Sequence, residues 1–488
     1  MEGTRQSLLI QIVDWVANKS GQENMDVFWF YGLSGIGKTS LAHSICASLH
    51  KRSRLAGDFF CRRDDPNLSE PRNILPTLIY KLAMIFPLFR TILAKHLRED
   101  PNLTAKSMND SLLLDLINSL PCHPEHNLVF VIDALDECGD SQSREGLLNV
   151  LTNAATEVPW LKIIITSRPE VDIQQTLIQP TYFSCDLATD QDASADLQTF
   201  ARSQFDLVAS VWHLDTPWPG ESDFNRAISR ANGIFIFIKT LVLSLEHCED
   251  PEESLKGALQ DSAETGLRSL YELYSSILKA QIVHKQSEFQ RVIAVLLATS
   301  PYRALGDATI AELAGVKPSL VNLWVDALSS LLYRDDATNG GIRVRHLSVY
   351  DFFISDHFDY QVDVGEANVR VGIACLQTMV THLRFNICRL EDSRLANADI
   401  KDLPSRVKQN VSDALQYSCL HWSNHLCPPL DNRDRRPLVL GNLKKFFEGL
   451  YPLLWVEVLS VMGMVPIGVT SLQRLLTWFG VSTSPACC

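Results

Sequence analysis

The chain has 488 residues, a formal net charge of −13 and 46% hydrophobic residues. It exceeds the length at which a single hydrophobic core stops growing, so we expect about two to four packed modules. The charged fraction of 21% is ordinary for a globular protein and argues against long disorder or a fibrous repeat. The acidic balance disfavours nucleic acid as a partner.

The cysteine pattern and the N-terminus indicate an intracellular protein. The twelve cysteines form no C-x-x-C pair, and the first residues lack the basic leader and unbroken apolar core of a signal peptide. We therefore expect reduced thiols and a cytoplasmic location. The apolar stretch from Leu450 to Val469 is long enough for a membrane span, but Glu457 and Pro466 favour a buried helix and turn, so no transmembrane segment is predicted.

The strongest motif lies near the N-terminus. Residues 5–19 have helical periodicity and lead into an apolar run, Val27–Tyr31, which predicts a strand. A glycine-rich turn comes next that matches G-x-x-x-x-G-K-[ST], the P-loop pattern, and a helix is predicted directly after it. The predicted nucleotide-binding residues of this segment are Gly32, Leu33, Ser34, Gly35, Ile36, Gly37, Lys38, Thr39 and Ser40.

Each residue type in this pattern has a chemical reason. The glycines let backbone N–H groups turn inward around phosphate oxygens, and the helix that starts near Lys38 offers its positive N-terminal end. The Lys38 ammonium would reach the outer phosphates, and the Thr39 hydroxyl would hold Mg²⁺. The alternative is a glycine-rich turn with no ligand, which the complete motif between a strand and a helix disfavours.

The next segments carry no chemistry of their own. DFFCRRDD, from Asp58 to Asp65, predicts a second strand that ends in charged residues. Apolar residues recur at helical spacing from Ile74 to Leu97, and a further helical segment is predicted from Ser111 to Leu120.

A second chemical signal is LVFVIDALDECGD, from Leu128 to Asp140. Its apolar half predicts a buried parallel strand that ends in Asp133, at the edge of the sheet where open α/β folds bind ligands. Asp133 would bind Mg²⁺, while Asp136 or Glu137 would orient or deprotonate an attacking water. The alternative is a helix N-terminus that carries acids for its dipole.

A third buried strand, LKIIITSRP, runs from Leu161 to Pro169 and ends in polar residues. Arg168 would read the γ-phosphate or stabilise charge during its transfer. The alternative is a surface arginine at a strand exit. A fourth strand, around Tyr182–Leu187, completes the predicted α/β region.

Beyond Asp190 the periodicity is helical, except for one short strand near Ile342–Arg345. A buried helix is predicted from Ala231 to Glu246, opening at Gly233, and two helices are predicted between Asp307 and Leu332, split at Lys317-Pro318. Together with the strand and HLSVYDFF from His346, these helices indicate a winged-helix module. Acidic residues surround it, so we expect packing rather than DNA binding.

Two histidines near the C-terminus have a spacing that a metal site could use. His421 and His425 fall on one helical face, with Cys419 and Cys427 nearby. No second ligand pair at standard zinc spacing is found, so half-buried histidines are the favoured interpretation.

Together, YGLSGIGKTSLA, FVIDALDEC and KIIITSRP resemble the NACHT family of STAND-class P-loop NTPases. In that family an aspartate ends the strand of the second motif and an Asp-Glu pair follows shortly after it, as Asp136 and Glu137 follow Asp133. The family also has a Thr/Ser-Ser-Arg sensor after the next strand, as at Thr166-Ser167-Arg168. The resemblance is greatest to the fungal members with a nephrocystin-3-like N-terminal part. It runs from about Gly3 to Met462; the effector domain and WD-type repeats that members usually carry are not in this sequence.

The resemblance implies further site residues. Gly3-Thr4-Arg5 looks like the element that the family places near the adenine, so it implies nucleotide contacts for Thr4 and Arg5. The histidine of the family's winged-helix signature contacts the β-phosphate of ADP, which implies that role for His346. Where the family commonly has Gly-x-Pro against the adenine, this chain has Gly233-Ile234-Phe235.

The expected fold is therefore an α/β P-loop NTPase, a parallel sheet flanked by helices, followed by all-helical and winged-helix domains. The expected function is an ATP/ADP-binding signal-transduction switch or oligomerisation module, NLR-like, with Mg²⁺, self-association or NLR-type partners and at most slow ATP hydrolysis. A nucleotide-binding scaffold without turnover and a small-molecule P-loop kinase are the alternatives. The predicted segments are an N-terminal helix (1–22), the nucleotide-binding domain (23–188), a helical domain (189–265), a winged-helix-like domain (266–360) and a helical region (361–488).

Overall fold

The computed structural model describes most of the chain. The described residues are 4–17, 26–99, 116–117, 120, 123–179, 182–190, 192–246, 248–260, 264–356, 359–392, 394–427 and 436–480. Gly3 and most of the predicted helix Ser111–Leu120 lie outside them. The chain packs as two compact units, residues 1–277 with 346–348 and residues 278–345 with 349–488, and each unit has its own core.

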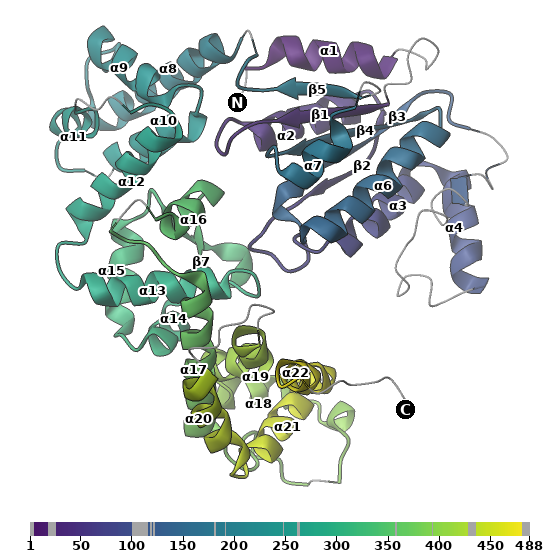
Figure 1. The fold of residues 1–488 in the computed structure, drawn as a ribbon, viewed down its shortest axis with the longest axis vertical. Helices are drawn as coiled ribbons and strands as arrows, with labels where there is room; N and C mark the ends of the chain where they lie inside the picture. The colour runs from purple at the N-terminus through teal and green to yellow at the C-terminus, as the bar shows by residue number, and fades with distance from the viewer. Residues whose placement is uncertain are drawn as a thin grey trace. The chain divides into compact units, whose positions relative to one another are not determined.

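The first unit is organised around a five-stranded parallel sheet (Figure 1). Its strands, in spatial order, are β2 (Leu55–Phe60), β3 (Leu128–Asp133), β4 (Leu161–Ser167), β1 (Val27–Tyr31) and β5 (Phe183–Asp186). Because the strands are parallel, all their carboxyl ends meet at one edge. Because β4 lies between β1 and β3, that edge brings the turn after β1 and the acids after β3 to either side of Ser167.

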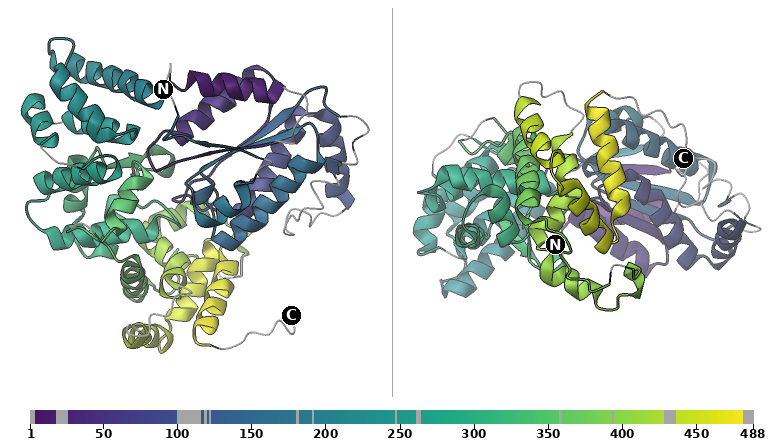
Figure 2. Two further views of the ribbon diagram at one scale, coloured as in Figure 1. Left: turned by 45° about the horizontal axis from the view of Figure 1, so that its top comes forward. Right: turned by 90° about the horizontal axis from the view of Figure 1, so that it is seen from below.

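Helices cover both faces of this sheet, which explains why its strands are apolar on both sides. Strand residues such as Trp29, Phe130 and Ile165 pack in one core with helices α3 (Ile74–Ile85), α6 (Ser141–Glu157) and α7 (Val171–Leu177). Phe28, Val131 and Ile164 point the other way and pack with α1 (Gln6–Ala17) and α2 (Lys38–Lys51). The two layers of helices can be followed in Figure 1 and in the left view of Figure 2.

The predicted α/β elements are present with shifted boundaries. The second strand begins at Leu55 rather than Asp58, because Ala56 is buried beside β3. The helical stretch Ile74–Leu97 is two helices, α3 and α4 (Pro87–Glu99), because the Pro87 ring does not fit inside a continuous helix.

The rest of the first unit is helical. Its helices are α8 (Ala193–Trp212), α9 (Glu221–Ala231), α10 (Phe235–Leu245), α11 (Pro251–Ala258) and the greater part of α12 (Leu267–Gln281). The helix predicted over Ala231–Glu246 was placed too early. Asn232 and Gly233 both have positive φ angles and end α9, so α10 begins at Phe235.

The second unit begins with three helices and a two-stranded antiparallel hairpin, the order of a winged-helix module. These elements are α13 (Gln286–Thr299), α14 (Asp307–Ala314), α15 (Pro318–Ala327), β6 (Leu332–Asp335) and β7 (Gly341–Val344). The predicted split at Lys317-Pro318 is confirmed. The prediction of a single strand here was wrong, because β6 is too short to show an alternating pattern.

Helices make up the remainder of the second unit. They are α16 (Leu347–Ile354), whose first two residues belong to the first unit, α17 (Val364–His382), α18 (Leu403–Asn410), α19 (Asp413–Leu426), α20 (Arg436–Phe447), α21 (Tyr451–Val461) and α22 (Val465–Trp478). The helix and turn predicted at Leu450–Val469 are present as α21 and the turn that leads into α22. The prediction that this helix is buried holds only in part, because Leu453 is 70% exposed. In the described part of the chain, no helix combines the length and the hydropathy that a membrane crossing needs.

Candidate functional site

The turn between β1 and α2 has the backbone that its glycines predict. Gly35 and Gly37 have φ angles of +82° and +98°, a region that side-chain-bearing residues rarely adopt. Space is restricted as well, since a Cβ on Gly35 would lie 2.3 Å from a methyl group of Ile236 on α10. The turn therefore requires glycine both for its conformation and for its close approach to α10.

Lys38 opens α2 and folds back over this turn. Its Nζ donates to the carbonyl oxygens of Gly32 (2.8 Å) and Leu33 (2.9 Å). Burial lowers the pKa of the ammonium, against the opposing charge of Asp136. Of the predicted loop residues, Leu33 and Thr39 are exposed, and the others are buried or half-buried. The turn thus presents a cation and the start of a helix at the carboxyl edge of the sheet.

Asp133 ends β3 at that edge and is 1% exposed. Its carboxylate accepts hydrogen bonds from the hydroxyls of Thr166 on β4 and Thr39 on α2. Burial raises its pKa, and these two hydrogen bonds and the charge of Lys38 act in the opposite direction. The structure therefore brings together Thr39 and Asp133, the two residues predicted to hold Mg²⁺.

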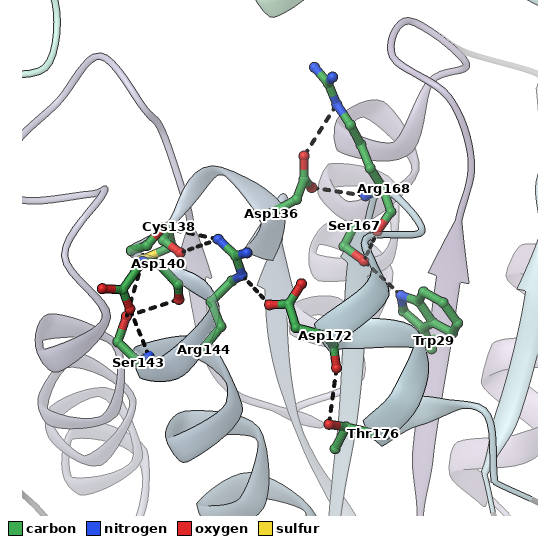
Figure 3. Close-up of polar contacts among 11 residues, drawn as sticks. Trp29, Asp136, Cys138, Asp140, Ser143, Arg144, Ser167, Arg168, Asp172 and Thr176 are labelled. Carbon is green, nitrogen blue, oxygen red and sulfur yellow. Dashed lines mark hydrogen bonds and ion pairs between the residues drawn. The ribbon is translucent and has the colours of Figure 1, made fainter. Parts of the chain in front are cut away.

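Asp136 and Arg168 form a pair between the strand ends (Figure 3). One carboxylate oxygen of Asp136 accepts the backbone N–H of Arg168 at 2.9 Å, and the other lies 3.3 Å from its Nε. The guanidinium also reaches the P-loop, where its NH2 is 3.4 Å from Oγ of Ser34. The arginine predicted as a charge sensor is thus oriented by the predicted acid and lies beside Ser34 of the P-loop turn.

Glu137 is held differently. It accepts the backbone N–H of Arg63, which follows β2, at 3.2 Å. Burial and the neighbouring charge of Asp136 raise its pKa to about 7. A carboxyl group with a pKa near neutrality is suited to exchanging protons at physiological pH.

The loop that carries Asp136 and Glu137 is held by contacts with two helices, α6 and α7 (Figure 3). Arg144 on α6 donates to the carbonyl oxygens of Cys138 and Gly139 and pairs with Asp172 on α7 at 2.7 Å. Asp140 caps α6 through the backbone N–H of Ser143 at 2.9 Å. The loop is thereby tied to two helices, which fixes where Asp136 and Glu137 project.

His346 belongs to the same unit, although it is far away in the sequence. Its Nδ1 accepts the backbone N–H of Ser348 (3.1 Å) and lies 2.7 Å from the Ser348 hydroxyl, which in turn is 2.8 Å from the hydroxyl of Tyr274 on α12. Burial, followed by the charges of Lys38, Arg168 and Lys239, lowers the pKa of His346 to about 4. The ring is therefore neutral at pH 7 with its proton on Nε2, ready to donate.

Three of these residues were not singled out by sequence reasoning: Ser348, Tyr274 and Lys239. Ser348 had a signal, because it lies two residues after the predicted histidine. Tertiary packing alone brings the Tyr274 hydroxyl to Ser348 and lets the charge of Lys239 act on His346, and their helices show only ordinary periodicity.

Arg5 is held by protein groups at the end of the α/β region. Its side chain is 4% exposed, pairs with Asp190 and donates to the carbonyl oxygen of Leu187, while its backbone N–H binds Asp196 at 2.8 Å. Arg5 therefore ties the N-terminus to the end of β5 and the start of α8. Thr4 beside it is also buried.

The histidine pair of the second unit is packed as an interior cluster. The prediction that both are half-buried was wrong for His425, which is fully buried. Its Nε2 is 2.7 Å from the hydroxyl of Tyr417, and its Nδ1 is 2.8 Å from the side-chain oxygen of Asn368 on α17. Both ring nitrogens are thus used by protein partners.

One comparison with known proteins matches the N-terminal part of the chain. Residues 3–168 match the family model described as Nephrocystin 3, N-terminal, and this match spans the P-loop, Asp133 and Arg168. This segment is similar to nephrocystin 3 N-terminal domains. The match covers about a third of the chain, and the fold of this domain is that of a P-loop NTPase. No curated protein matches the chain.

Solved structures resemble the chain only distantly. They include the Walker-type ATPase PABY2304 of Pyrococcus abyssi (15% identity, 71% of this chain and 95% of that chain, TM-score 0.35). The Orc1 protein of Aeropyrum pernix in complex with DNA has 10% identity, coverage of 73% and 93%, and a TM-score of 0.31. Cdc6p of Pyrobaculum aerophilum has 10% identity, coverage of 72% and 94%, and a TM-score of 0.33. At these TM-scores the likenesses carry no argument about what this chain binds.

Proposed function

We propose that the chain is an ATP/ADP-binding switch of the NACHT type that acts in signal transduction through self-association or NLR-type protein partners. The observation that carries the proposal is the convergence at one sheet edge. Lys38, the Asp133–Thr39 pair and the Asp136–Arg168 pair come from three different strand ends and meet around the P-loop turn. Such a set of groups suits a nucleotide phosphate chain.

The residues present fit a magnesium ion. Oxygen donors are the ligands that Mg²⁺ takes in phosphate sites, and the Thr39 hydroxyl and the Asp133 carboxylate already share a hydrogen bond. When bound, Mg²⁺ would neutralise phosphate charge. These two side chains would hold it, while Lys38 and Arg168 bind and orient the outer phosphates.

The geometry favours separate roles for the two acids after Asp133. Asp136 is engaged by Arg168 through both carboxylate oxygens, so we assign it to positioning that arginine. Glu137 accepts one hydrogen bond from a backbone N–H and has a pKa near neutrality, so we assign it to orienting or deprotonating the attacking water in a slow hydrolysis.

The chain path around His346 supports a switch rather than a static site. Residues 346–348 pack in the first unit, whereas the residues on both sides of them belong to the second. A nucleotide that holds His346 therefore restrains the second unit through covalent connections on both sides. We propose that ADP, bound by the Nε2–H of His346, maintains one state and that exchange for Mg-ATP releases it and permits oligomerisation.

The test is to identify the nucleotide that co-purifies with the full chain and to measure its mass in solution before and after exchange into Mg-ATP. Bound ADP on a monomer that assembles with ATP is the expected result. Nucleotide-dependent melting without turnover or change of mass would favour a scaffold that binds nucleotide only for stability. Phosphate transfer to a metabolite would favour a small-molecule kinase.

A further inference from the structure

Helix α10 meets the P-loop directly. The backbone N–H of Ile236, in its first turn, donates to the carbonyl oxygen of Gly35 at 3.3 Å, and the Ile236 side chain packs where a Cβ on Gly35 would lie. Residues three apart in a helix share a face. Lys239 therefore lies on the same side of α10 as Ile236, one turn further along.

Lys239 is unusual in its helix. The neighbouring residues Phe237, Ile238, Thr240 and Leu241 are buried, whereas Lys239 is exposed. It is the one charged residue in the segment FIFIKTLVLSL, which is otherwise almost entirely apolar. Its side chain is not needed for the core of α10.

The charge of Lys239 acts on a residue of the candidate site. Its charge acts on His346 together with those of Lys38 and Arg168. Lys38 donates to two loop carbonyls and Arg168 pairs with Asp136, whereas Lys239 has no hydrogen-bond or ion-pair partner among the residues that the structure describes. Three cations thus act on one neutral imidazole, and within the described residues no acid neutralises Lys239.

We propose that Lys239 is a further phosphate-binding residue of this site and that its ammonium contacts the terminal phosphate of a bound nucleoside triphosphate. This inference rests on the proposed nucleotide-binding function. A lysine on a flexible stem can follow an added phosphate, and a cation without an acid partner compensates best for the added negative charge. The contact between α10 and the nucleotide would then form with a triphosphate and be absent with a diphosphate.

The test compares the affinities of the full chain for Mg-ATP and for ADP by calorimetry in Lys239→Ala, Lys239→Met and Lys239→Arg. We expect Lys239→Ala and Lys239→Met to weaken ATP binding by about 10-fold and ADP binding by less than about twofold. The methionine variant keeps the apolar stem and so separates charge from packing. Lys239→Arg keeps the charge and should stay within about threefold of the wild type.

Lys256→Ala on α11 is the matched control, because this exposed lysine lies in the same unit and its ion pair is with Glu252 on its own helix, at 3.9 Å. It should change neither affinity. Equal loss of ATP and ADP affinity in the Lys239 variants, or no loss, would overturn the inference. A wild-type chain that binds neither nucleotide would instead overturn the proposed function, so the two failures are distinguishable.

Discussion

The carboxyl edge of the sheet in the first unit and the interior of the second unit both bury titratable side chains. At the sheet edge, Lys38, Asp133 and Arg168 come from separate strand ends and converge on the P-loop turn. In the second unit, His425 on α19 is enclosed between Tyr417 of the same helix and Asn368 of α17. Its pKa is lowered to about 3 by burial, further than that of His346.

The comparison shows that a perturbed pKa alone does not identify a functional site. His425 has the larger shift, but both its nitrogens are used by neighbours within the fold. In His346, within the part of the chain that the structure describes, only Nδ1 is engaged, by Ser348, and the charges of Lys38, Arg168 and Lys239 act on the ring. The distinguishing feature of the sheet edge is that charged groups from three separate strand ends converge on the P-loop turn.

The largest effect at the sheet edge is expected when the ammonium group of Lys38 is removed. Lys38→Ala should weaken ATP binding by more than about 100-fold, because in the proposed function the ammonium makes charge-assisted contacts to the outer phosphates. Calorimetric titration with ATP measures the loss. Lys51→Ala, at the exposed far end of the same helix, is the control and should bind as the wild type does. Unchanged affinity in Lys38→Ala would remove the phosphate assignment.

A second substitution separates the two acids of the site. Glu137→Gln should lower ATP turnover by about 100-fold and leave ADP affinity unchanged, because a general base acts on the reaction rather than on binding. Asp136→Ala should weaken turnover and ATP binding together, because it releases Arg168. Phosphate release measures the turnover of both variants, and calorimetry measures their nucleotide affinities. Equal behaviour of the two variants would contradict the division of roles.

The sheet edge could be predicted from the sequence because its residues lie in contiguous motifs. The glycines of a P-loop pattern predict the conformation of the turn. An acid or arginine at the end of an apolar strand lies at the carboxyl edge because parallel strands all end there. Asp133 and Arg168 therefore follow from local patterns and the parallel sheet. His346 came from a family resemblance, since spacing alone cannot bring it to a lysine more than 300 residues earlier.

Other features could not be predicted because tertiary packing decides them. Lys239 looks like a solvated lysine until α10 is seen against Gly35. The strand β6 is four residues long and shows no alternation. The resemblance to the NACHT family implies a nucleotide contact for Arg5 and could not predict the buried ion pair of its side chain with Asp190.

The interior histidine cluster of the second unit should affect the free energy of unfolding at acidic pH rather than ligand binding. The pKa of His425 is about 3 when folded, below the value of about 6.5 in an unfolded chain, so the unfolded state binds more protons between these values. Its contribution to stability is complete above about pH 6.5 and falls as the pH decreases, by about 2 kcal/mol at pH 5.

Urea unfolding at pH 5, 6 and 7 tests this expectation. His425→Gln should lessen the pH dependence by about 2 kcal/mol between pH 7 and pH 5 without abolishing it, because the lowered pKa of His346 acts in the same direction. His284→Gln, at an exposed position of the same unit, should leave the pH dependence unchanged. An equally steep pH dependence in His425→Gln would show that another group causes it.

The smallest expected effect is a loss of ADP affinity that tests the role proposed for His346. The Tyr274 hydroxyl supports Ser348, which fixes the ring with its proton on Nε2, so Tyr274→Phe should lower ADP affinity by about threefold. A double-mutant cycle with His346→Ala decides whether this effect passes through the histidine. In the His346→Ala background, Tyr274→Phe should have almost no further effect, and Tyr271→Phe, one turn earlier on α12, should have none in either background. The same threefold loss with and without His346 would mean that Tyr274 acts on the fold of α12 rather than on the orientation of the imidazole.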